Sequence, residues 1–217
     1  NYFNAQTGLL EPRAVGTVVT NLAGGSIIGD SDDGVRLIGG GTVTNAGQIE
    51  GRVGIGADGV SMFALNGQNT IGQASIGTVI NQTGGTIFGN RFGIILSGGG
   101  IVNNAGVILA SDFSNGTLDG FGGGVLFQAG PTESGKIGTL TNGGSISGGN
   151  GVIYGANLAS GSLSNSGSIT GTRSGGVNNT GANTITIDNQ AGGSITGALK
   201  GIHAAEGAVI VTNAGSI

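Results

Sequence analysis

The residues of this 217-residue chain that could do chemistry are mainly carboxylates. Three of them, Asp30, Asp32 and Asp33, lie together in the segment GDSDDG, where oxygen atoms on one turn could hold a calcium ion. The spacing of an EF-hand and the GGxGxD pattern of calcium-binding β-rolls are both missing. We therefore interpret this segment as a solvated corner and predict no metal site.

A catalytic centre would need acids or bases that converge in space. Glycoside hydrolysis uses a pair of carboxylates, and the chain offers scattered candidates. They are Asp58, Asp112, Asp119, Glu133, Asp188 and Glu206, together with the single histidine, His203. Cysteine is absent, which excludes thiolate nucleophiles and zinc-thiolate sites. The segment GIGADG (54–59) matches a nucleotide-binding pattern but has no helical sequence after it. We predict no catalytic residue and no cofactor.

Composition narrows the possible partners. The chain has 7 Lys+Arg residues, a net charge of −4 and a pI near 4.6, so it lacks the basic patch that binds nucleic acid or anionic lipid. It has 51 glycines and only 8% charged residues, but its mean hydropathy is positive, which argues against disorder. No apolar run reaches the length of a membrane span, so we expect no membrane insertion of this segment.

A repeat of about 24 residues runs through the sequence and predicts the architecture. Its phrase is typified by VTNAGQIEG and LSNSGSITG, in which a valine, leucine or isoleucine stands two residues before an asparagine and Gly-x-Ile follows. The eight asparagines in this phase are Asn21, Asn45, Asn81, Asn104, Asn142, Asn165, Asn189 and Asn213.

Each repeat has the local chemistry of strands and tight corners. Stretches such as TVTN and TITIDN alternate apolar and polar residues, and Asn and Gly suit sharp turns. A further apolar stretch, such as GVRLI or GVIY, follows in most copies. We predict an all-β protein, a parallel β-helix (β-solenoid) with three strands per rung, right-handed because β crossovers prefer that hand.

The stacking of rungs leads to further expectations. We predict some nine rungs, with the eight asparagines stacked inward as a hydrogen-bonded ladder. Asp30 and Arg52 each follow their repeat's isoleucine by three residues, so we expect them to be neighbours on successive rungs. The closing TNAGSI repeats the opening of a rung, and we expect the chain to be a section of a longer coil.

These repeat phrases resemble the passenger repeats of bacterial autotransporters, the type V secreted surface family. The resemblance covers residues 16–217 and implies an exported β-solenoid, at the bacterial cell surface or secreted, of a kind that often acts as an adhesin. It implies as partners a host-surface protein, a glycan or a second copy of the chain.

Two regions interrupt the repeat, while residues 1–15 precede it. The long gaps place insertions near 57–76 and 111–137 in a single solenoid domain, 16–217. Insertions in solenoids often lie on the binding side. The large apolar residues in these insertions are therefore candidates for a loop contact patch, namely Met62, Phe63, Phe113 and Phe121.

The sequence thus favours a non-catalytic stalk or adhesive passenger segment. Two alternatives stay open. One is a polysaccharide-processing or tailspike-like β-helix, which requires Asp58, Asp112, Asp119 or Glu133 to meet in a groove. The other is a self-assembling extracellular fibre subunit, because the ends of a solenoid expose unpaired strands.

Overall fold

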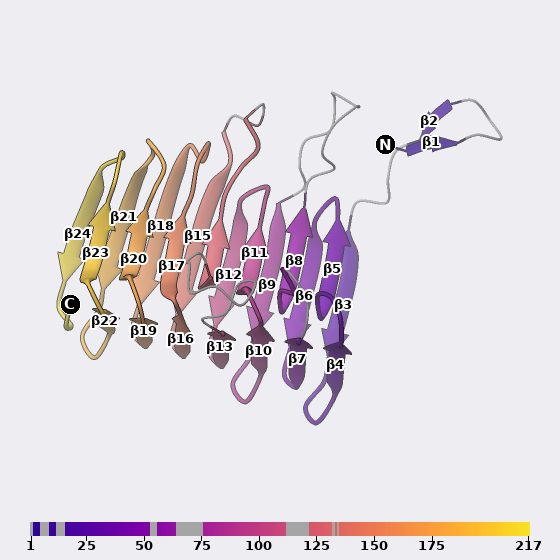
Figure 1. Ribbon diagram of the computed structural model, residues 1–217, viewed down its shortest axis with the longest axis horizontal. Coiled ribbons are helices and arrows are strands. Elements are labelled where there is room, and N and C mark those ends of the chain that lie inside the picture. The colour runs from indigo at the N-terminus through magenta and orange to yellow at the C-terminus, as the bar shows by residue number, and fades with distance from the viewer. Residues whose placement is uncertain are drawn as a thin grey trace.

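The computed structural model describes residues 2–4, 9–11, 16–52, 56–63, 76–111, 122–131, 133 and 135–217. In this part of the chain all regular structure is β, and the strands wind into a coil whose rungs stack along one axis (Figure 1). Every pairing within the coil is parallel and joins equivalent strands of neighbouring rungs. The chain is a parallel β-helix with three strands per rung.

Three sheets run along the coil, one for each strand of the rung. The first sheet contains β3 (Thr17–Asn21), β6 (Gly41–Asn45), β9 (Gly77–Asn81), β12 (Gly100–Asn104), β15 (Ile137–Asn142), β18 (Ser160–Asn165), β21 (Thr184–Asn189) and β24 (Val209–Asn213). The second contains β4 (Ser26–Gly29), β7 (Gln48–Gly51), β10 (Thr86–Gly89), β13 (Val107–Ala110), β16 (Ser145–Gly148), β19 (Ser168–Gly171) and β22 (Ser194–Gly197). The third contains β5 (Val35–Ile38), β8 (Val60–Phe63), β11 (Phe92–Leu96), β14 (Gly123–Phe127), β17 (Asn150–Tyr154), β20 (Gly175–Asn179) and β23 (Lys200–Ala204).

The described residues form seven complete rungs and the first strand of an eighth, so the expectation of nine rungs was wrong. The reason is that the two long gaps lengthen connections instead of adding described rungs. In the insertion expected at 57–76, β8 is the ordinary third strand of the second rung, and in that at 111–137, β14 is the third strand of the fourth. At ~4.8 Å per rung the first and eighth rungs lie about 34 Å apart.

Two short strands precede those of the coil in the sequence, β1 (Tyr2–Asn4) and β2 (Leu9–Glu11), and they pair antiparallel in a separate sheet.

The core consists of columns of like residues, because parallel pairing in constant register stacks each residue on its equivalent in the next rung. The isoleucine of the repeat shows this best: in the second to seventh rungs it is fully buried. These residues are Ile49, Ile87, Ile108, Ile146, Ile169 and Ile195. A single rung could not bury this face, so stacking supplies the hydrophobic stabilisation.

In every complete rung a glycine lies at the start of the third strand, at a position that faces the core. Because glycine has no side chain, the second and third sheets can approach each other closely there. These glycines are Gly34, Gly59, Gly93, Gly124, Gly151, Gly176 and Gly201. A Cβ atom at Gly93 would lie 2.5 Å from Cγ2 of Ile108 in the next rung and 2.7 Å from the Gly124 carbonyl oxygen. Any larger residue would therefore push the second and third sheets apart.

The corner between the third and first sheets is filled by large side chains facing small ones. The column on the third sheet is Leu37, Met62, Leu96, Phe127 and Tyr154. The first-sheet residues that meet this column are glycines, and a Cβ atom at Gly138 would lie 2.7 Å from Cγ of Phe127. The Phe127 and Tyr154 rings stack at 5.4 Å.

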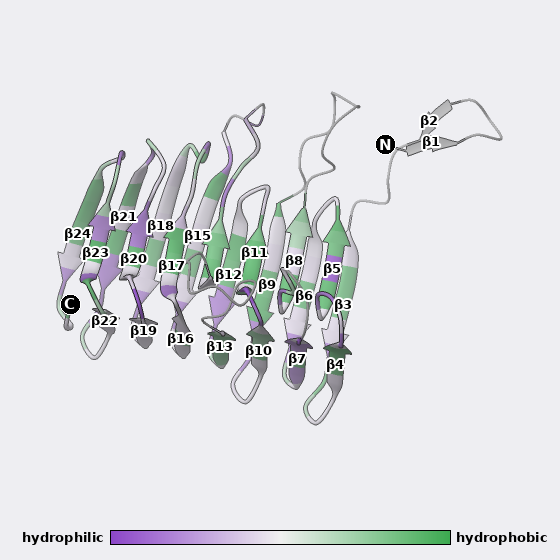
Figure 2. Cartoon of the chain, viewed as in Figure 1, coloured by the Kyte–Doolittle hydropathy of each residue, from purple (hydrophilic) through white to green (hydrophobic). Residues whose placement is uncertain are grey.

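After Tyr154 this corner changes character. The column continues with Asn179 and Ala204, and the facing glycine is replaced by Ile185 in β21 and Val209 in β24. Figure 2 shows the same change along the third sheet, where β8 and β11 are largely green and β20 and β23 carry purple. The sixth rung therefore buries the polar side chain of Asn179 where the earlier rungs bury rings and aliphatic chains.

Candidate functional site

The asparagines of the repeat form a continuous hydrogen-bonded ladder at the end of the first-sheet strands. The side-chain amide of each donates to the Oδ1 atom of the next, at distances of 2.8–2.9 Å. All eight predicted asparagines take part, and seven of them, all except Asn213, are buried.

The ladder also satisfies the turns that follow each strand. Asn142, for example, donates to the carbonyl oxygens of Gly144 at 3.3 Å and Ser168 at 3.2 Å. All amide-to-amide bonds point the same way, toward the C-terminal rungs, so the ladder has a donor end and an acceptor end. The hydrogen-bonding groups of these asparagines are therefore occupied within the coil.

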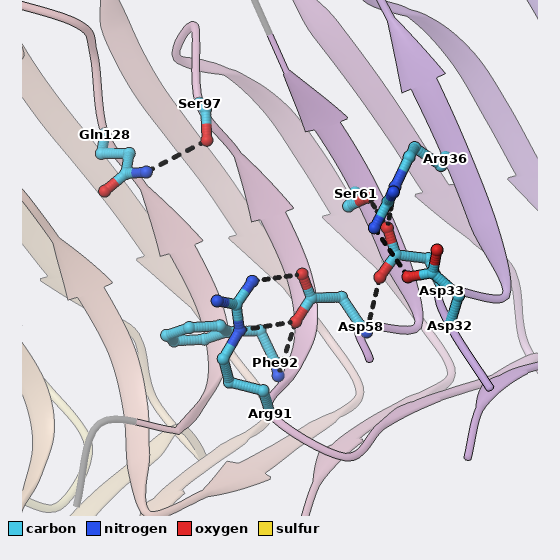
Figure 3. A network of polar contacts seen from close by, with 9 residues as sticks. All are labelled: Asp32, Asp33, Arg36, Asp58, Ser61, Arg91, Phe92, Ser97 and Gln128. Carbon is cyan, nitrogen blue, oxygen red and sulfur yellow. Dashed lines mark hydrogen bonds and ion pairs between the residues drawn. The ribbon is translucent and has the colours of Figure 1, made fainter. Parts of the chain in front are cut away.

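A second polar network lies where the third strands of the first two rungs begin (Figure 3). Asp33 is buried, and its carboxylate accepts hydrogen bonds from the Asp58 backbone N–H at 2.8 Å and from Arg36 Nε at 2.7 Å. The Ser61 hydroxyl donates to the same carboxylate. Arg36 also pairs with Asp32 at 2.7 Å. Asp33 is therefore not part of a solvated corner as we had expected, because it caps the strand of the next rung.

Asp58 repeats this arrangement one rung further on. Its carboxylate accepts from the Phe92 backbone N–H at 3.1 Å and from Arg91 at 2.8 and 3.1 Å. The side chain has no exposed surface. Burial raises the pKa of Asp58 to about 6, and the hydrogen bonds from Arg91 lower it only in part.

Apolar and aromatic side chains adjoin this network on the outer side of the third sheet. Phe92, Ile95 and Leu126 form a small buried cluster against which Phe63 packs. Arg91 lies over the Phe92 ring at 5.2 Å and Arg36 over that of Phe63 at 5.9 Å, within the range of cation–π attraction. Both faces of β11 and β14 are consequently buried, whereas β12 buries one face and exposes the other.

The predicted contact patch is only partly within the described residues. Met62 is a core residue at 2% exposure, so it does not belong to an exposed patch; it points inward because β8 is a regular strand of the coil. Phe63 is half-buried beside Arg36. Phe113 and Phe121 lie outside the described residues.

The other predicted residues lie in several places. Asp30 and Arg52 pair at 3.5 Å across successive rungs, which confirms that prediction. Glu133 accepts a bond from the Gly130 backbone within its own connection, and Asp188 is exposed on β21. His203 is half-buried on β23. Asp112 and Asp119 lie outside the described residues, and the described ones contain no group of three or more possible metal ligands.

These positions decide what the acids can do. A carboxyl group with a pKa near 6 has the protonation behaviour of a general acid. Both oxygens of Asp58 are nevertheless held by Arg91 and by the backbone of the next rung, inside the protein. The network therefore links the first three rungs to one another and stabilises their stacking. Sequence reasoning missed it, although aligning Asp33 with Asp58 at the start of the third strands would have revealed it.

A shallow depression, open to solvent, lies at the corner between the third and first sheets in the fifth to seventh rungs. Asn183, which is 6% exposed, lines it together with residues of the turns before β18, β21 and β24. Sequence reasoning did not single out Asn183, because it lies outside the repeat phase of the ladder.

Comparison with known proteins finds no matching family model, no similar curated protein and no similar solved structure. In the part of the chain that is described, no helix is long and apolar enough to cross a membrane.

Proposed function

We propose that this chain is a non-catalytic, structural or adhesive segment of an exported β-solenoid, similar to the passenger of an autotransporter. The observation that carries the proposal is how the buried polar residues are used. The asparagine ladder, Asp33 and Asp58 all bind groups in the neighbouring rung, so they strengthen a coil. The passenger-like repeat phrases support an extracellular location.

The lateral faces of the coil supply the surface for contact. On the outer side of the first sheet, Thr139, Thr141, Ser162, Ser164 and Thr186 form a regular array of hydroxyl groups. Equivalent positions of the second sheet carry serine or threonine as well, as in SISG, SITG and SITG of β16, β19 and β22. Such a surface offers repeated hydrogen-bond donors and acceptors to a host-surface protein or a glycan.

Two experiments test this proposal. An antibody raised against the coil should label intact cells of the source organism if the segment is displayed at the surface. The purified chain should bind host cells or immobilised glycans without shortening a polysaccharide. Efficient turnover of a polysaccharide would show instead that the chain is an enzyme of the tailspike or lyase kind.

A further inference from the structure

The buried carboxyl groups of Asp33 and Asp58 occupy one repeated position, the residue before the glycine at the start of the third strand. Each carboxylate reaches into the next rung, because Asp33 accepts a hydrogen bond from the Asp58 backbone and Asp58 accepts one from the Phe92 backbone. In the five later rungs this position holds no carboxylate; its residues are Phe92, Gly123, Asn150, Gly175 and Lys200. Buried carboxylates therefore join only the first three rungs in this way.

The network around Asp58 contains more negative than positive charge. The described residues that face it are Asp32 and Asp33 from the segment before β5, Arg36 from β5 itself, and Arg91 from the segment before β11. Three carboxylates therefore share two guanidinium groups. The side chains of Asp33 and Asp58 have almost no exposed surface, so solvent does little to offset the excess.

The charged residues on the second-sheet side do not correct this imbalance. Glu50 and Asp30 both pair with Arg52, at 2.9 and 3.5 Å, so this group also has one negative charge in excess. Burial and neighbouring negative charge both favour the neutral form of a carboxyl group. For Asp58 this agrees with a pKa raised to about 6, with burial as the main cause and the charge of Asp33 as a smaller one.

Asp58 lies where this effect acts on a single contact, that between the second and third rungs. Around it, the Gly59 N–H donates to the Phe92 carbonyl oxygen and the Arg91 N–H donates to the Ala57 carbonyl oxygen, both at 3.0 Å. In a solenoid each rung contacts only its neighbours, so stability is approximately a sum of rung and contact terms. A cost at this contact therefore favours opening of the first two rungs and leaves the contacts between later rungs unchanged.

We propose that the contact between the second and third rungs is a pH-sensitive joint, at which the first two rungs open as one unit while the later rungs stay folded. The joint is closed most firmly at acidic pH, where Asp58 is neutral. It weakens as the pH rises from about 4 to about 6, because the folded state must then hold the charged carboxylate inside the protein. This property does not depend on the adhesive function.

Amide hydrogen exchange of the full chain, followed by NMR at pH 4 and pH 6 and corrected for the intrinsic pH dependence of exchange, tests the joint. The Gln82 and Thr86 amides donate to the second rung across the joint. They should exchange ~30-fold faster at pH 6, as follows from pKa values of ~3.9 in the open state and about 6 in the closed state. The matched amides of Gln190 and Ser194, which donate to the sixth rung in the same way, should change less than about twofold.

Two variants assign the effect to Asp58. Asp58→Asn should abolish the difference between the two pH values at Gln82 and Thr86, because an amide side chain does not titrate. Asp188→Asn, the same change at an exposed acid of β21, should keep the difference. The comparison of rungs within the wild-type protein needs no variant, so it decides the question even if Asp58→Asn does not fold.

Three results would overturn the joint. The first is equal protection of the Gln82 and Thr86 amides at both pH values. The second is an equal change at Gln190 and Ser194, which would show that the coil opens as a whole. The third is a difference that persists in folded Asp58→Asn, which would assign the titration to another group.

Discussion

Asn142 and Asn183 are both buried asparagines, but their surroundings are opposite. Asn142 stands in the repeated phase, where it accepts a hydrogen bond from Asn104 and donates to Asn165, both at 2.8 Å. Asn183 stands outside that phase, and its amide has no partner. In a solenoid, a buried amide is satisfied by its equivalent in the next rung only when the next rung repeats it. An unrepeated amide such as that of Asn183 has no equivalent in the next rung to bond to and stays buried without a partner.

The largest expected effect comes from breaking the ladder. Asn142→Leu removes bonds to Asn104, Asn165, Gly144 and Ser168 and leaves the side-chain Oδ1 atom of Asn165 without its donor from the ladder. We expect a loss of about 3 kcal/mol in the free energy of unfolding, measured by urea denaturation. A loss below ~0.5 kcal/mol would show that the ladder contributes little to stability.

The second largest expected effect is a change of stability with pH, caused by the buried carboxyl group of Asp58. The pKa of Asp58 in the folded protein, about 6, lies above its value of ~3.9 in an unfolded chain. Between these pH values the folded state binds more protons than the unfolded state, so stability falls as the pH rises from about 4 to 6. We expect Asp58 to contribute a decrease on the order of 2 kcal/mol, measured by urea denaturation across this range.

Two variants isolate the contribution of Asp58 to this pH dependence. Asp58→Asn should flatten the stability curve in the window between pH 4 and 6, because the amide does not titrate. Asp188→Asn, which changes an exposed acid on β21, should leave the curve as it is. Identical curves for the wild type and Asp58→Asn would contradict the assignment.

Replacing Asn183, at the corner between the third and first sheets, should change the unfolding free energy less than Asn142→Leu does, and in the opposite direction. Asn183→Leu removes two unpartnered polar groups from a buried position, so we expect the protein to gain about 1 kcal/mol in unfolding free energy. Thermal and urea unfolding both measure this. A marked loss of stability would mean that the amide of Asn183 bonds within the protein.

The smallest effect is expected on the surface. Asp30→Ala removes the partner of Arg52 across two rungs, but both side chains are exposed, and Arg52 also pairs with Glu50 at 2.9 Å. We expect the unfolding midpoint to stay within experimental error, since surface ion pairs contribute little. A clear shift of the midpoint would show that this ion pair contributes to the stability of the coil.

The repeat allowed much of the coil to be predicted. Because parallel stacking keeps each repeated residue over its equivalent, the phase of Asn45 and Ile49 was enough to locate the ladder and a core column. The same phase placed Asp30 beside Arg52.

The remaining features depend on residues that do not repeat. Asp33 and Asp58 align only when the third strands are matched across connections of unequal length, and Met62 looks like a loop residue until β8 is recognised. Asn183 carries no signal in a single rung. Its lack of a side-chain partner, like the change from Tyr154 to Asn179 in the corner column, appears only when rungs are stacked.

The most direct test of this account compares Asn142→Leu with Asn183→Leu in one set of urea titrations. The account predicts changes of opposite sign, with unfolding free energies that differ by about 4 kcal/mol between the two variants. Equal destabilisation by both substitutions would contradict it, because the repeated and the unrepeated asparagine would then serve the fold alike.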